Sequence, residues 1–114
     1  MGRRTATRAH VLVALRRYKP NMSLRRLGDL IDSATLEEVK GDVVSEGSLA
    51  FGIVRDGLLR VTVDGETQWV GPGEVFGISQ YLLKSGNYQM KITGMQPANH
   101  YLAFTHEMVM KIDA

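Results

Sequence analysis

Residues 51–77 read FGIVRDGLLRVTVDGETQWVGPGEVFG, a pattern of short apolar runs separated by glycine-containing turns. Asp-Gly occurs twice, at Asp56-Gly57 and Asp64-Gly65, and this dipeptide favours hairpins because a type I′ turn needs positive φ at both central residues. We therefore predict three consecutive strands in an antiparallel meander. Along the middle strand, alternate side chains (residues 59, 61 and 63) are apolar, which predicts a sheet with one buried face.

Two helices are predicted upstream of this β-region. Apolar residues recur at helical spacing from Arg8 to Tyr18, and the following Lys-Pro-Asn ends the helix because the residue before proline avoids the αR region. Ser23 is a suitable N-cap for a second helix over Leu24–Ser33. The predicted organisation is one domain, with a disordered leader (1–7), a basic helical pair (8–33) and a β-roll (34–114). We also expect that the chain is cut from a longer protein.

The composition is that of an ordinary globular domain of 114 residues without cysteine. It contains no apolar run long enough for a membrane span and no secretory signal, so we expect an intracellular, cytoplasmic protein. The acidic residues fit solvated faces and turns, and no serine lies in a nucleophile-elbow context. The three histidines, His10, His100 and His106, lack the spacing of a metal site. We expect no enzyme activity, no cofactor and no metal.

Charge is distributed unevenly along the chain. Residues 1–28 carry eight basic residues and no acidic one, whereas the remainder carries all twelve acidic residues. This basic arm is interpreted first as a solvated helical leader; the alternatives are contact with nucleic acid, an anionic membrane surface or an acidic protein face. Its members are Arg3, Arg4, Arg8, Arg16, Arg17, Lys19, Arg25 and Arg26.

Three segments, KGDVVSEGS (40–48), FGIVRDGLLRV (51–61) and GPGEVFGISQYLL (71–83), together resemble the cyclic-nucleotide-binding domain. The resemblance covers about residues 11–112 and implies a mainly β fold with flanking helices. That fold is an antiparallel, jelly-roll-like β-roll preceded by two short helices. The glycines in these segments suit the corners of the roll, where positive φ is needed without a Cβ atom.

The resemblance also locates a phosphate-binding cassette, and there the sequence departs from the family. The family glutamate that follows Phe-Gly corresponds to Ile78, and the family arginine corresponds to Asn87 or Tyr88. No arginine follows Arg60, so a shifted alignment does not restore one. The family's hydroxyl-bearing residue falls near Met90 or Lys91. Losing these charge-assisted hydrogen bonds, at about 1.5–3 kcal/mol each, argues against binding of cAMP or cGMP in the usual pose.

A residual pocket can still be defined from the resemblance. Amides of residues 77–80 could receive an anion at the start of a short helix, with Lys84 or Lys91 as the local cation. Alternatively, Ile78, Tyr81 and Tyr88 could fill the pocket themselves. The candidate pocket residues are Phe76, Gly77, Ile78, Ser79, Gln80, Tyr81, Tyr88 and Lys91.

A weaker likeness links Phe76-Gly-Ile-Ser79 to the cyclic-nucleotide-binding-like domain of PDZ-containing Rap exchange factors. The combined expectation is a non-enzymatic regulatory and interaction module in signalling, whose partners are another protein or flanking domains of a parent chain. A cyclic-nucleotide sensor with an altered phosphate site is the alternative. Trp69 is expected to be a core or half-buried strand residue, the alternative being an interface anchor. The late methionines, Met90, Met95, Met108 and Met110, are expected mostly in the core, the alternative being that the last two form an adaptable surface.

Overall fold

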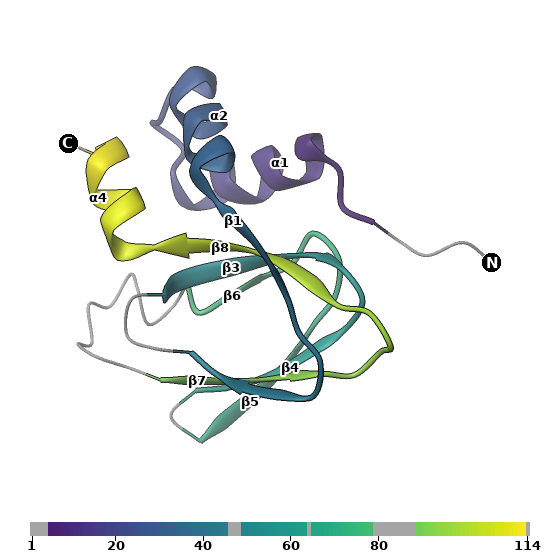
Figure 1. Cartoon of the computed structure of the whole chain (residues 1–114). Coiled ribbons are helices and arrows are strands. Elements are labelled where there is room, and N and C mark those ends of the chain that lie inside the picture. The colour runs from purple at the N-terminus through teal and green to yellow at the C-terminus, as the bar shows by residue number, and fades with distance from the viewer. Residues whose placement is uncertain (1–4, 46–48, 64, 79–88, 114) are drawn as a thin grey trace.

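The computed structural model describes residues 5–45, 49–63, 65–78 and 89–113, and it consists of a β-roll with helices on one side (Figure 1). The helices are α1 (Arg8–Tyr18), α2 (Leu24–Ser33) and α4 (His106–Asp113). The strands are β1 (Thr35–Glu38), β2 (Asp42–Val44), β3 (Leu49–Asp56), β4 (Leu59–Val63), β5 (Glu66–Val70), β6 (Val75–Phe76), β7 (Met90–Gly94) and β8 (His100–Thr105).

Both predicted N-terminal helices are confirmed with their predicted bounds. Thr7 caps α1 in a capping box in which its backbone N–H donates to Nδ1 of His10 at 3.0 Å. Ser23 caps α2 by accepting a hydrogen bond from the Arg26 amide at 3.2 Å. Because polar side chains satisfy the first amides, each helix begins at the residue after its cap.

Eight strands form two four-stranded sheets, with the orders β1-β8-β3-β6 and β2-β7-β4-β5. All described pairings are antiparallel, and the two sheets enclose the interior of the roll (Figure 1). The hairpin predicted at Asp64-Gly65 is confirmed, since β4 pairs with β5 across it. The predicted three-stranded meander is wrong: β3 and β4 lie in different sheets, so Asp56-Gly57 turns a corner instead of closing a hairpin.

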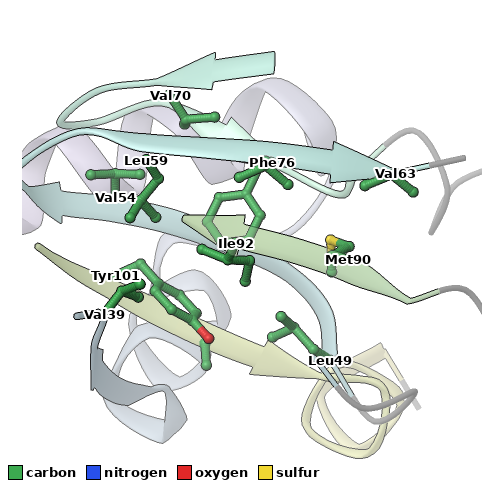
Figure 2. Close-up of a cluster of buried hydrophobic side chains, with 12 residues drawn as sticks. Val39, Leu49, Val54, Leu59, Val63, Val70, Phe76, Met90, Ile92 and Tyr101 are labelled. Carbon is green, nitrogen blue, oxygen red and sulfur yellow. The ribbon is translucent and has the colours of Figure 1, made fainter. Parts of the chain in front are cut away.

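The core has two parts, and β3 and β8 contribute to both. One cluster lies inside the roll between the sheets (Figure 2). The other lies between the outer face of β1-β8-β3-β6 and the helices, where the rings of Phe51 and Phe104 stack with centroids 4.8 Å apart. Along β4, Leu59, Val61 and Val63 are buried, as the alternation predicted.

The predicted disordered leader is wrong for residues 5–7. The Ala6 amide donates to the Arg55 carbonyl at 2.7 Å, the Ala6 side chain is buried, and Thr5 forms a bridge with Asp56. Pairing with the end of β3 satisfies this backbone, so the segment is part of the fold. No helix in the described ranges is long and apolar enough to cross a membrane.

Candidate ligand pocket

The segment that leads into the candidate pocket is the corner at residues 71–74. The Gly71 amide donates to Oε1 of Glu74 at 2.8 Å, and Gly73 has a φ of +84°. Backbone hydrogen bonds join this corner to β3: the Gly73 amide donates to the Val54 carbonyl at 2.8 Å, and the Val54 amide donates to the Glu74 carbonyl at 3.0 Å. The corner therefore fixes the start of β6.

Phe76 enters the roll because the opposite residue has no side chain. Gly52 pairs with Phe76, and a Cβ atom built on Gly52 would lie 2.3 Å from the ring. The Phe76 ring meets the Tyr101 ring edge-on, with centroids 5.2 Å apart. Phe76 is fully buried, so this aromatic pair occupies the middle of the roll (Figure 2).

Gly77 follows at a φ of +83° and lies against Met90. A Cβ atom on Gly77 would lie 2.8 Å from the Met90 sulfur, so glycine is required here by space as well as by backbone conformation. Met90 itself is fully buried. Met90, one of the two candidates for the hydroxyl-bearing position, is thus a thioether that packs in the core.

The buried cluster inside the roll is apolar. Of its twelve members, Tyr101 alone has a polar side-chain atom, and none carries a charge. Burial raises the pKa of Tyr101 to about 12, and the negative charge of Glu37 acts in the same direction. The members are Val39, Leu49, Val54, Leu59, Val61, Val63, Val70, Phe76, Met90, Ile92, Tyr101 and Ala103.

The structure brings together only part of the predicted pocket. Phe76 and Gly77 are buried at its expected position, but Ile78 packs against the helix-side cluster instead of filling the roll. The prediction that Lys91 lines the pocket is wrong. It lies between the inward-facing Met90 and Ile92, so its side chain is on the outer face of the sheet, with Nζ 3.8 Å from Asp42. Four predicted pocket residues lie outside the described residues: Ser79, Gln80, Tyr81 and Tyr88.

A cleft of about 250 Å³ opens beside Gly77 and Ile78, between β6 and the β4–β5 hairpin. Tyr18 of α1 closes one side, and the remaining lining comes from β4, β5 and Val75. Glu66 is the one charged side chain among the lining residues. The described part of this cleft therefore offers a negative charge where a cyclic phosphate would need a positive one.

Asn99 is a structural residue that the sequence analysis missed. Its side chain is fully buried and links three corners of the roll. Oδ1 accepts from the amides of Leu58 at 3.0 Å and Gln96 at 3.3 Å, while Nδ2 donates to the carbonyls of Val39 at 3.1 Å and Gln96 at 2.8 Å. Nothing local in the sequence indicates these distant partners.

Trp69 is also placed differently from the expectation. It is 53% exposed and lies on the outer face of the β2-β7-β4-β5 sheet, so the expected core or half-buried position is wrong and the exposure that an interface anchor needs is present. The register aligns four outward-facing residues across this sheet, in the order Asp42, Thr93, Arg60 and Trp69. The strand alternation that buries Val70 places its neighbour outside.

The late methionines divide between core and surface. Met90 is buried and Met108 packs against the helix-side cluster, as predicted for core residues. Met95 and Met110 are exposed, at 41% and 71%, because they lie just beyond β7 and on the outer side of α4. The expected core position is therefore wrong for Met95, whereas exposed Met110 agrees with the alternative that the last two methionines form an adaptable surface.

The histidines lie apart and have different surroundings. His100 lies between two carboxylates, with Nδ1 2.8 Å from Asp56 and Nε2 3.2 Å from Glu38. Lys40 lowers the pKa of Glu38, and His100 contributes in the same direction. Within the described residues, no three His, Asp or Glu side chains are grouped so as to hold a metal ion.

The basic arm is partly accounted for by the helices. Arg3 and Arg4 lie outside the described residues. Arg8 is paired with Asp32 of α2, which raises the pKa of Arg8, and it also donates to the Gly28 carbonyl at 3.3 Å. The other arginines of the arm, Arg16, Arg17, Arg25 and Arg26, are exposed.

Comparisons with known proteins support the architecture. Neither the scan against protein families nor the search of curated proteins gives a match. Among solved structures, the chain is similar to a cyclic nucleotide-binding-like protein from Brucella abortus bv. 1 str. 9-941, with a TM-score of 0.65 and 16% sequence identity. The similarity covers 89% of this chain and 95% of the other. The protein therefore has a cyclic-nucleotide-binding-like fold, as its glycine-punctuated sequence predicted.

Proposed function

We propose that the protein is a non-enzymatic regulatory and interaction module that does not bind cAMP or cGMP in the usual pose. The observation that carries this proposal is the apolar interior of the roll. Phe76, Met90 and Ile92 are each fully buried there, and the surrounding cluster contains no charged side chain. A cyclic nucleotide entering this space would have to displace packed side chains and leave its phosphate without a counter-charge.

The positions of two cations on the described strands of the roll support the same conclusion. Arg60, the last arginine in the chain, and Lys91 both lie on the outer face of the β2-β7-β4-β5 sheet. Strand alternation prevents either side chain from turning inward without moving its whole strand by one residue. A bidentate arginine–phosphate contact contributes two charge-assisted hydrogen bonds of about 1.5–3 kcal/mol each, so its loss lowers affinity by at least about 100-fold.

The outer face of the same sheet offers a place for a protein partner or a flanking domain of a parent chain. Trp69 is exposed there beside Arg60, and tryptophan and arginine are the residues most enriched at interface hot spots. The sole tryptophan of the chain is thus available as an interface anchor.

A thermal-shift titration tests the proposal directly. We expect no change in Tm with millimolar cAMP, cGMP or cyclic dinucleotides beyond that given by 5′-AMP, which serves as the control for nonspecific nucleotide effects. A ligand present at 100 times its Kd would add about 2.7 kcal/mol and raise Tm by about 10 °C in a domain of this size. Such a shift, confirmed by calorimetry, would support instead a cyclic-nucleotide sensor with an altered phosphate site.

A further inference from the structure

Five cations surround the turn between the first two helices. Arg16 and Arg17 lie in the last turn of α1, Arg25 and Arg26 in the first turn of α2, and Lys19 between them. We call these five residues the basic corner. In the parts of the chain that the structure describes, none of its four arginines makes an ion pair, whereas Arg8 at the other end of α1 is paired with Asp32.

Two of these arginines are placed against the preference of their helix. The first turn of α2 has no acidic residue. The unpaired backbone N–H groups at this end of the helix favour negative charge and disfavour Arg25 and Arg26. The helix gains no capping from them either, because Ser23 provides the cap. Their positions therefore do not serve the stability of α2, which points to a role toward something outside the fold.

The basic corner is also hollowed. A depression of about 360 Å³ lies over the turn, and its lining combines two cations with a phenol and a side-chain amide, which are suitable donors for a phosphate group. The lining residues are Tyr18, Lys19, Pro20, Asn21, Met22 and Arg26. Both helices lie on the side of the roll away from the β2-β7-β4-β5 sheet (Figure 1).

Exposed aliphatic side chains lie beside the charges. Leu24 precedes Arg25 and is 63% exposed; Val13 is equally exposed and lies one turn before Arg16 and Arg17 on α1. Residues three and four apart share one face of a helix, so Val13 and these two arginines lie together. Aliphatic groups among cations suit the headgroup boundary of a bilayer, whereas single-stranded nucleic acid is bound with aromatic stacking.

We propose that the basic corner docks on bilayers that contain anionic phospholipids, with a lipid phosphate in the depression and Leu24 at the acyl boundary. This docking is independent of the ligand preference of the roll. A basic residue near an anionic leaflet contributes about fivefold in affinity at low salt. Because the attraction is electrostatic, binding should weaken as salt screens it.

Vesicle flotation with the full chain tests this proposal. We expect binding to vesicles of phosphatidylcholine with phosphatidylserine and none to phosphatidylcholine alone. The double variant Arg25→Gln/Arg26→Gln should lower the partition coefficient by about 30-fold, from about fivefold per arginine. Its Tm should be unchanged or higher, since two cations are removed from the amide end of α2. Leu24→Ser should lower binding by about fivefold through the loss of its apolar contact.

The matched control is Arg60→Gln, which removes the same charge from the opposite side of the molecule. It should change vesicle binding by less than about twofold, since exposed charges beyond a Debye length are screened. Equal losses for Arg60→Gln and for either single arginine variant of α2 would mean that net charge alone attracts the protein, and would overturn the proposal. So would an absence of binding to anionic vesicles at low salt.

Two competitors identify the source of the phosphate. Soluble glycerophosphoserine, at the same headgroup concentration, should compete weakly because it lacks an acyl boundary for Leu24. Strong competition would assign the depression to a free phosphate ester and contradict docking on a bilayer. Tighter binding of single-stranded RNA than of vesicles, unaffected by Leu24→Ser, would also refute the proposal in favour of nucleic acid.

Discussion

Replacing Asn99 by alanine should destabilise the roll more than any comparable change of a polar side chain at the surface. The side chain makes four hydrogen bonds in a fully buried position, two of them to the distant residues Val39 and Leu58. At about 1 kcal/mol net for each bond, the expected loss is about 4 kcal/mol. Folded domains have a total stability of about 5–15 kcal/mol, so this loss is a large fraction of it.

Thermal and urea denaturation of Asn99→Ala measure this loss. At about 4 °C per kcal/mol for a domain of this size, Tm should fall by about 15 °C. The matched control is Gln68→Ala, which removes an exposed amide whose one contact, to the Val75 carbonyl, is 3.4 Å long. The control should cost less than about 0.5 kcal/mol. A loss at Asn99 no larger than that of Gln68→Ala would refute the idea that Asn99 holds the corners.

Asn99→Asp separates hydrogen bonding from packing, because it keeps the shape of the side chain and replaces its NH2 group by an oxygen atom. The new oxygen would face the carbonyls of Val39 and Gln96, which repel a carboxylate. Burial and repulsion should raise the folded-state pKa of this aspartate above its unfolded value of about 3.9. Its stabilising protonated form is then lost as pH rises, so the deficit relative to the native chain should shrink between pH 7 and 4. A deficit independent of pH would indicate packing alone.

Two further predictions follow from the same region. Gly57→Ala should destabilise the fold by at least about 2 kcal/mol, because φ is +86° and the new Cβ would lie 2.5 Å from Oδ1 of Asn99. The control Gly65→Ala, at a φ of +80° with open space around it, should cost about 1 kcal/mol. Equal losses of Tm in the two variants would contradict the predicted clash. The pKa of Tyr101 is raised to about 12, so the stabilisation of the fold by its neutral hydroxyl is complete below pH 10 and is lost as pH rises toward 12. The raised pKa corresponds to a stabilisation of about 2.7 kcal/mol, which solvent screening near Glu37 reduces to about 1–2 kcal/mol. Urea titrations at pH 9 and 11 should therefore show a smaller fall in stability for Tyr101→Phe than for the native chain, and parallel curves would show that this hydroxyl does not contribute.

The sequence predicted elements whose signals are local. Both N-terminal helices have an apolar stripe together with a cap, and those two signals agree on where each helix begins. The β4–β5 hairpin has an Asp-Gly turn between two strands that pair directly across it. Local chemistry is sufficient in these cases because the partners are near neighbours in the chain.

The predicted meander failed because residues distant in the sequence determine the outcome. Gly57 has the positive φ that an Asp-Gly turn suggests, but β3 pairs with β6 and β8 instead of β4, and the Leu58 amide after the turn donates to Asn99, 41 residues later. Trp69 and Lys91 were misplaced for a simpler reason. Each is next to a buried residue on its strand, and strand alternation alone would have placed both side chains outside.

The packing at the corners of the roll explains why its glycines are required with or without a ligand. The glycines that revealed the fold are required by packing and backbone conformation: Gly77 makes room for Met90, and Gly57 for Asn99. These requirements come from the corners of the roll, so they remain whether or not a ligand binds.

Strand β3 contributes side chains both to the interior of the roll and to the cluster beneath the helices. Val54 of this strand packs inside the roll, whereas Phe51 and Ile53 pack against the helix-side cluster. A β-bulge between Leu49 and Phe51 shifts the register at the start of the strand. Because one strand is buried on both faces, a change in the packing of the roll displaces groups that support α1 and α2.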